Sequence, residues 1–378
     1  FLFSRGFIKT GLGKRIAYNL IAAFGSSSLR LSYALALSDL ILAPATPSNT
    51  ARVGGVIMPI TTSLAKAFGS EPQDGPRKIG SFLMQSIYQV NTITSAMFQT
   101  SMAGNTLVAA LALQSFGIGI TWGDWAMAAI VPGIIALIIM PYFIYKVYPP
   151  EIKDAREAQQ MIREELKGLG KMSFQEWVML GVFVLALVLW ATSQFTKIDA
   201  TTVAFLGISI LLATGVLIWD DVKSEKGAWD TLVWMGTLMG FAGFLSKLGF
   251  IKWATVLVGG YIPEGSWIIA FVIAVLINTY SHYVFASLTA HISAMFVAFS
   301  AIAISAGAPP MLTLLMIAFT SNLCMSLTHY AAGPSPVIFN TGYVPQNTWW
   351  KLGFFSSVIN LIIFVGLGSI WMKAIGMW

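Results

Sequence analysis

Apolar runs of about 18 or more residues recur along most of the chain, separated by short polar stretches. A run of this length spans about 30 Å of hydrocarbon as an α-helix. The pattern therefore predicts an all-α, polytopic membrane protein. Full spans are expected at about 124–147, 176–194, 200–218, 229–248 and 352–372, with interfacial pieces at 1–25 and 250–260.

Two places depart from this plan, because a pair of apolar arms flanks a few small polar residues. The arms at 28–45 and 53–67 flank a first tip, SNT at 48–50, and the arms at 265–286 and 292–306 flank a second tip, SLT at 287–289. The first arms are near the lower length limit for a span. Each pair is therefore predicted to form a re-entrant helical hairpin.

Two longer apolar segments are interrupted by small polar residues near their middle. The segment at about 79–117 is interrupted by QTSMAGN at 99–105, and the segment after Pro310 is interrupted by THYAAGPSP at 328–336. A helix broken at membrane depth must line a cavity enclosed by protein, since lipid cannot satisfy its free backbone groups. Both segments are predicted to be broken transmembrane helices.

The same order of elements occurs twice, which predicts an internal repeat. The motif SNTAR at 48–52 matches SLTAH at 287–291 in the pattern Ser-x-Thr-Ala-base, and TSMAG at 100–104 matches THYAAG at 328–333 with one insertion. The expected division is a first repeat at 1–149, a linker at 150–175 with ten charged residues, and a second repeat at 176–378.

The distribution of basic residues predicts the orientation of the two repeats. Residues 1–90 hold nine of the 22 basic residues, residues 150–228 hold eight, and residues 229–378 hold four. By the positive-inside rule, the first hairpin opens from the cytoplasm and the linker helix is cytoplasmic. Counting spans forward places the ends of the second hairpin outside, so that the two repeats are inverted.

Composition excludes several other classes of protein. Only 10% of the residues are charged, against about a quarter in a soluble protein, so the net charge of +6 indicates cytoplasmic loops and no nucleic-acid partner. The single cysteine, Cys324, excludes an internal disulfide framework and a Cys-based metal cluster. The chain has no His-Glu-x-x-His, phosphate loop or acidic pair deep in a span, so neither an enzyme nor a cofactor is expected.

Inverted repeats with discontinuous helices are the recurring plan of secondary transporters, with the substrate at the repeat interface. The amino ends of half-helices present free N–H groups and a positive dipole end there. Such groups can bind carboxylates without a buried lysine, which would hold a dianion too tightly for release. We therefore expect a cavity for a small anion with two or three carboxylates.

Three motifs carry a family resemblance. TPSNTAR at 46–52 resembles the Ser-Asn-Thr signature of the divalent anion/sodium symporter family. HYVFAS at 282–287 with TAH at 289–291, and LTHY at 327–330 with GPSP at 333–336, look like its branch of 2-oxoglutarate/malate, citrate/succinate and tartrate/succinate translocators. The resemblance covers nearly the whole chain.

The resemblance implies a homodimeric, elevator-type carrier of di- or tricarboxylates in a bacterial inner membrane or a plastid inner envelope. Both hairpins and both broken helices would move together, and about three further spans would precede Phe1. The implied substrate-binding residues are Ser48, Asn49, Thr50, Ser287, Thr289, His291, Gly333 and Pro334. The implied ion-binding residues, for Na⁺ as a possible coupling ion, are Thr46, Ser48, Asn49, Ser101, Gly104, Thr289 and Ala332.

The second tip departs from the pattern of sodium-coupled members, which repeat Ser-Asn-Thr there. Leu288 replaces the asparagine and offers no oxygen to Na⁺. Pro44 stands where a hydroxyl would help the other sodium site, and Thr46 is the substitute that the sequence offers. We therefore expect anion exchange. The alternatives are a sodium-coupled carboxylate symporter and a related carrier of an inorganic oxyanion.

The sequence leaves two alternative roles for several residues. His282 is expected to be structural, whereas His291 and His329 either are hydrogen-bonded structural residues or contact a carboxylate. Arg52 either binds substrate or pairs within the protein. Asn322, next to Ser321 in an apolar run, is expected to make helix–helix hydrogen bonds.

Overall fold

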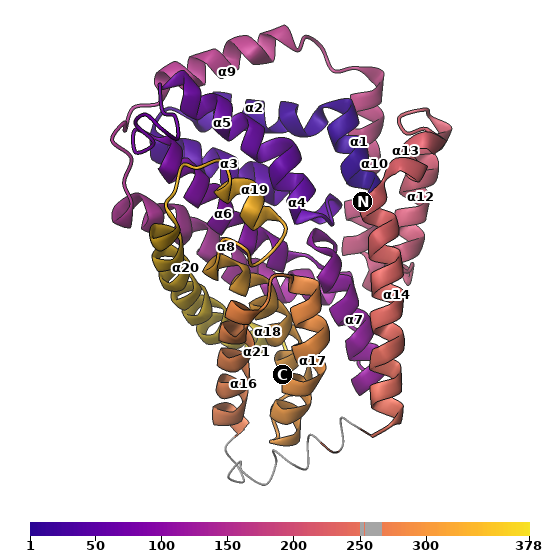
Figure 1. The fold of residues 1–378 in the computed structure, drawn as a ribbon. Helices are drawn as coiled ribbons and strands as arrows, with labels where there is room; N and C mark the ends of the chain where they lie inside the picture. Colours follow the sequence, from indigo (N-terminus) through magenta and orange to yellow (C-terminus); the bar gives the residue numbers. More distant parts are fainter. Residues whose placement is uncertain (250–252, 254–266) are drawn as a thin grey trace.

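The computed structural model describes residues 1–249, 253 and 267–378 (Figure 1). The described residues form helices joined by short loops, with one isolated antiparallel bridge between Ser27 and Asp154. The all-α prediction is therefore confirmed. The interfacial piece predicted at 250–260 lies, apart from Trp253, outside the described residues.

The basic amino-terminal stretch forms two helices instead of the single predicted one. Helix α1 (Leu2–Thr10) and helix α2 (Leu12–Phe24) meet at Gly11. Gly11 has φ of 76°, a left-handed conformation that side chains other than glycine rarely adopt, so the helix ends there.

The first predicted tip coincides with a break in the helix. Helix α3 (Ser28–Leu42) ends in a 3₁₀ turn at Ala43–Ala45, and helix α4 (Asn49–Arg52) begins after three non-helical residues. The break follows from Pro47, which lacks an N–H and disfavours helical backbone in the residue before it. From Asn49 the chain stays helical through a π turn at Val53–Ile57 into α5 (Met58–Ala67).

The first interrupted segment also has its break where the sequence predicts it. Helix α6 (Gly80–Met97), every residue of which is buried, is followed by a 3₁₀ turn at Gln99–Ser101 and helix α7 (Ala103–Phe116). Phe98 and Met102, on either side of the turn, have extended backbone. Helix α8 (Trp122–Val147) then corresponds to the span predicted at 124–147.

The charged linker contains helix α9 (Arg156–Gly168), which lies across the top of the view in Figure 1. It is fastened to the end of α2, because Gln159 Nε2 and Arg163 Nη2 donate to the carbonyl oxygen of Ala22 at 2.8 and 3.1 Å. The linker is therefore packed against the first half of the chain along one face.

The second half contains the remaining helices and three irregular turns. In chain order they are α10 (Phe174–Ala191), α11 (Ser193–Thr196), α12 (Ala200–Ala213), α13 (Trp219–Ser224), α14 (Lys226–Lys247), α16 (Trp267–Ser281), a 3₁₀ turn (His282–Val284), α17 (Leu288–Ser305), α18 (Pro310–Leu323), a 3₁₀ turn (Cys324–Leu327), α19 (Pro334–Phe339), α20 (Gln346–Leu361), a π turn (Ile362–Gly368) and α21 (Ser369–Ala374). The break predicted at 328–336 thus falls between the second 3₁₀ turn and α19.

Six helical segments in the described part of the chain are long and apolar enough to cross a membrane. They are Trp122–Val147, Phe174–Ala191, Trp267–Val284, Leu288–Ser305, Pro310–Leu327 and Gln346–Ala374. The spans predicted at 200–218 and 229–248 are not among them, because α12 has only 14 residues and glycine, threonine and Asp230 dilute the apolar character of α14. The two arms around the second tip are each 18 residues long, and the helical arms around the first tip, 28–45 and 49–67, are of similar length.

Polar side chains join the two halves at the centre of the molecule. Asn322 Nδ2 of α18 donates to Asn105 Oδ1 of α7 at 2.8 Å, and Asn278 Nδ2 of α16 donates to Ser321 Oγ at 3.1 Å. The helix–helix role predicted for Asn322 is confirmed. All of these residues are buried, so the bonds fix the rotation of α18 between helices of both halves.

A close helix contact at Gly353 gives a first test of this packing. A methyl group there would lie 2.2 Å from the carbonyl oxygen of Ser326, a backbone atom that cannot rotate away. Gly353→Ala should destabilise the protein by about 1–3 kcal/mol, seen as a lower Tm in detergent.

Gly181→Ala is the matched control, because nothing lies within 4 Å of the added methyl group on α10. It should leave the Tm unchanged or slightly raised, since alanine favours helix by about 1 kcal/mol over glycine. An unchanged Tm in Gly353→Ala would show that α20 is not held against the turn.

Candidate functional site

The two predicted tips meet at one cavity of about 220 Å³. Its walls come from both tips and both broken helices, together with α14 and the first residue of the chain. The lining residues are Phe1, Pro47, Ser48, Asn49, Thr50, Met102, Ala103, Thr231, Ala286, Ser287, Leu288, Thr289, Ala332 and Gly333. Segments more than 200 residues apart in sequence thus share one site.

The first tip is organised as a helix start. Ser48 Oγ accepts a hydrogen bond from the backbone N–H of Ala51 at 3.1 Å, and Asn49 Oδ1 accepts from the N–H of Thr50 at 2.9 Å. These bonds satisfy two of the N–H groups that a helix leaves free at its amino end. Asn49 Nδ2 contacts Met325 Sδ at 3.6 Å, so the first tip also contacts the second broken helix.

The second tip repeats the helix start with one difference. Ser287 Oγ accepts from the N–H of Ala290 at 3.3 Å, which caps α17 as Ser48 caps α4. Leu288, at the position of Asn49, has 5% of its surface exposed and places an apolar group in the cavity wall. The two ends of the cavity therefore differ in polarity.

The loop of the second broken helix touches the first tip. A methyl group added to Gly333 would lie 2.2 Å from Thr50 Oγ1, so only glycine allows this approach. On the other side, a methyl group on Gly104 of α7 would lie 2.6 Å from Ile292 Cδ1 of α17. Each tip region thus packs against the broken helix of the other half of the chain.

Arg52 lies fully buried beneath the first tip, and all five of its N–H groups donate hydrogen bonds within the protein. Its Nε donates to Asp39 Oδ1 at 2.9 Å, and its Nη1 donates to the carbonyl oxygens of Thr46 and Ser101 at 3.0 Å each. Its Nη2 donates to Thr94 Oγ1 and Ser95 Oγ at 3.2 Å each. Of the two readings of Arg52, pairing within the protein is therefore the correct one.

Asp39 is satisfied as completely as its partner. Besides Arg52, its carboxylate accepts from Asn91 Nδ2 at 3.2 Å and from the hydroxyl of Thr94. Asp39 lies on α3, while its other partners lie on α6. The ion pair therefore ties the arm before the first tip to the first broken helix.

The structure divides the predicted site residues into two groups. On the cavity wall lie Ser48, Asn49, Thr50, Ser287, Thr289, Ala332 and Gly333. Away from it lie Thr46, Ser101, Gly104, His291 and Pro334. The carbonyl oxygens of Thr46 and Ser101 are already bonded to Arg52, and Pro334 is buried at the start of α19.

The three histidines stand behind the cavity wall. His282 and His291 are fully buried, and Nε2 of His282 bonds to the carbonyl oxygen of Ala331 at 2.9 Å while Nε2 of His291 bonds to Ser281 Oγ at 3.2 Å. His329 Nδ1 accepts from Trp350 Nε1 at 3.0 Å. The structural reading of His282 is confirmed, and neither His291 nor His329 reaches the cavity.

Some lining residues were not singled out from the sequence. The motifs contain Pro47, Met102, Ala103 and Ala286 without marking them as ligands, and these residues line the wall because the chain turns there. No sequence motif marks Thr231 of α14 as a site residue, since a single threonine in an apolar helix resembles any other. It lines the cavity only because α14 packs along α7.

No side chain that lines the cavity carries a formal charge at neutral pH. The nearest guanidinium along the chain, that of Arg52, has no donor left for a ligand. An anion in this cavity would therefore be held by hydroxyl groups, backbone N–H groups and helix amino ends. Such an arrangement attracts an anion through dipoles, and the cavity has no fixed positive charge when it is empty.

A multi-pass protein whose helices break around one polar cavity has the architecture of membrane transporters. The chain belongs to the sodium:sulfate symporter family, because the family described as the sodium:sulfate symporter transmembrane region matches residues 1–378. The family resemblance inferred from the motifs is therefore confirmed, and with it a transporter rather than an enzyme.

Individual relatives match along the whole chain. The putative malate transporter YflS of Bacillus subtilis is 51% identical over 379 residues, which cover 100% of this chain and 79% of the relative. Dicarboxylate transporter 1, chloroplastic, of Spinacia oleracea is 47% identical, with coverage of 100% and 67%. Inner membrane protein YbhI of Escherichia coli is 42% identical, with coverage of 100% and 79%. Two of these names state a location, the chloroplast and an inner membrane.

The Arg52–Asp39 pair gives a second test. Asp39→Asn leaves the guanidinium charge buried without its counter-ion, which should cost about 3–5 kcal/mol and strongly lower the Tm in detergent. Replacing both residues, Arg52→Met with Asp39→Leu, removes the lone charge but leaves the carbonyl oxygens of Thr46 and Ser101 without a donor, so it should recover only part of the loss.

Asp154→Asn is the control, since Asp154 pairs with Arg156 on an exposed surface and such pairs contribute little. Its Tm should match that of the unmodified protein. If Asp39→Asn were equally harmless, the buried pair would not be holding the first tip.

Proposed function

We propose that this protein is a secondary transporter of small di- or tricarboxylates of the malate, 2-oxoglutarate, succinate and citrate class. The proposal rests mainly on the cavity between the two tips, whose lining side chains offer hydroxyl groups and carry no fixed charge, and whose backbone offers N–H donors. Relatives named as malate and dicarboxylate transporters, 47–51% identical along the whole chain, support the carboxylate class.

In this proposal each tip holds one carboxylate end of the substrate. Ser48, Asn49 and Thr50 lie at one helix start, and Ser287 and Thr289 lie at the other. A volume of about 220 Å³ corresponds to about seven water molecules at about 30 Å³ each, which suits a short organic acid. Gly333 completes the wall against Thr50, while His291 and Pro334 support it from behind.

The same contacts support a rigid moving unit. Arg52 links the first tip to the first broken helix, Gly333 packs on Thr50, and Asn322 bonds to Asn105. These bonds join both tips and both broken helices into one body. We propose that this body moves as an elevator within a homodimer, with inverted repeats that open the first hairpin to the cytoplasm and the second to the outside.

We propose exchange of one anion for another as the mode of transport. At the second tip Leu288 supplies an apolar surface where an amide oxygen would be needed for Na⁺, a hard cation that prefers oxygen ligands. Near the first tip, the carbonyl oxygens of Thr46 and Ser101 are occupied by Arg52. A sodium-coupled symporter and a carrier of sulfate or another inorganic oxyanion are the alternatives to test.

Removing the hydroxyl groups of the first tip tests the site. Ser48→Ala with Thr50→Ala should raise the KM for labelled malate at least tenfold, because a hydrogen bond to a charged group contributes about 1.5–3 kcal/mol. The control is Ser305→Ala at the exposed end of α17, which should transport normally. Normal uptake by a folded double variant would remove the first tip from the binding site.

Proteoliposomes distinguish the mode of transport. Uptake of labelled malate should require malate inside the vesicles and should ignore an inward sodium gradient. Leu288→Asn should then introduce a response to sodium. Sodium-dependent accumulation in empty vesicles would instead make the protein a symporter, and uptake of sulfate that malate and citrate do not inhibit would make it an oxyanion carrier.

A further inference from the structure

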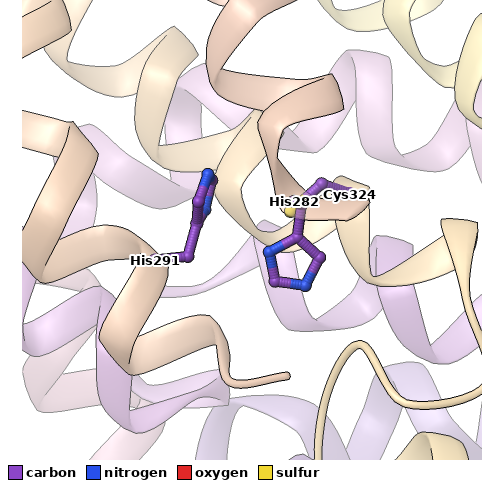
Figure 2. A group of neighbouring side chains, drawn as sticks. All are labelled: His282, His291 and Cys324. Carbon is purple, nitrogen blue, oxygen red and sulfur yellow. The ribbon is translucent and has the colours of Figure 1, made fainter. Parts of the chain in front are cut away.

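A second cluster of chemically reactive side chains lies behind the cavity wall. His282, His291 and Cys324 are fully buried, and one candidate ligand atom of each lies within 4.8 Å of the other two (Figure 2). The three residues come from separate elements: the 3₁₀ turn before the second tip, the first turn of α17, and the turn after α18. The cluster therefore bridges the second tip and the second broken helix.

The hydrogen bonds leave each imidazole with one unprotonated nitrogen that has no hydrogen-bond partner among the described residues. Nε2 of His282 must donate to Ala331, because a carbonyl oxygen only accepts. The Ser281 hydroxyl donates to the carbonyl oxygen of Asn278 at 3.0 Å, so it accepts from Nε2 of His291. In both rings the proton is thus placed on Nε2, and Nδ1 carries a lone pair with no partner in the described structure.

Two buried lone pairs without a donor are costly, since an unsatisfied polar atom loses about 1–3 kcal/mol on burial. The arrangement is the one that metal-binding histidines use, in which a second hydrogen bond fixes the tautomer and leaves the other nitrogen for the metal. The thiol of Cys324 donates to the carbonyl oxygen of Ser321 at 3.2 Å and keeps its sulfur lone pairs free.

The spacing suits a small ion after a modest contraction. A point equally far from three atoms that are up to 4.8 Å apart lies about 2.8 Å from each, against about 2.0–2.3 Å for metal bonds to imidazole nitrogen and thiolate sulfur. Inward movement of less than about 1 Å per side chain would close the gap. The lone cysteine excluded a site built from several cysteines, but two histidines complete a mixed one.

Ligand type and charge select the ion. Thiolate and imidazole favour soft or borderline cations, above all Cu⁺ and Zn²⁺. One thiolate and two neutral imidazoles give an uncharged site with Cu⁺ but leave one positive charge with Zn²⁺. A net charge is costly in a buried site among membrane helices, so the neutral complex is favoured.

We propose that His282, His291 and Cys324 form a binding site for Cu⁺. On binding, the S–H bond of Cys324 breaks, a Cu–S bond forms, and the proton leaves to solvent, with no change of oxidation state. Bound Cu⁺ would fix the second tip to the second broken helix and so would inhibit any step of the transport proposed above, such as substrate entry, in which these two segments separate.

Binding is measured first on the full chain, purified in detergent under anaerobic conditions and titrated with Cu⁺ against the chelator bicinchoninate. One Cu⁺ per chain is expected to bind. Cys324→Ala, Cys324→Ser and His291→Gln should each weaken binding at least a hundredfold. His329→Gln is the control and should bind as tightly as the unmodified protein, because His329 lies outside the cluster.

Each other outcome overturns the proposal. These outcomes are no binding of Cu⁺ by the folded protein, equal binding by the folded Cys324 and His291 variants, and tighter binding of Zn²⁺ than of Cu⁺. Two substitutions of Cys324 guard against a variant that fails to fold. No substrate takes part in the titration, so its result is independent of whether the protein carries carboxylates.

A transport assay then tests the consequence. Cu⁺ should block malate uptake in the unmodified protein and should not block it in Cys324→Ala. Equal inhibition of both would place the inhibitory ion elsewhere. Absence of malate uptake without copper would count against the proposed function and leave the copper titration unaffected.

Discussion

The candidate site depends on a guanidinium that never reaches it. Arg52 is buried next to a break in the helix, where backbone carbonyl groups lack the partners that a continuous helix would supply. By donating to the carbonyl oxygens of Thr46 and Ser101, it satisfies two such groups on two different broken segments. Asp39 balances its charge. The small polar tip can therefore stay unwound without facing lipid.

This arrangement separates charge from binding. The positive charge that makes the break possible is neutralised one layer below the cavity, and the cavity itself is left with dipoles. A carrier must release what it binds, and a dianion held by a buried lysine or arginine would leave slowly. Hydroxyl groups and helix ends bind an anion less tightly, because they attract it without a full opposing charge.

The sequence was informative where local chemistry decides the structure. Pro47 and the motifs QTSMAGN at 99–105 and THYAAG at 328–333 interrupt apolar runs, and the helices break within these stretches. It was less informative where tertiary contacts decide. The motif that contains Arg52 fits substrate binding and internal pairing equally well, and only the positions of Asp39, Thr94 and Ser95 distinguish them. His291 shares a motif with the second tip, yet its helical turn directs it away from the cavity.

The approach of Gly333 to Thr50 limits how such a site can change. A side chain at 333 would collide with the hydroxyl of Thr50, so a larger residue can be placed there only if Thr50 changes as well. Enlarging the residue at 333 would therefore take two coupled substitutions, one in each half of the chain.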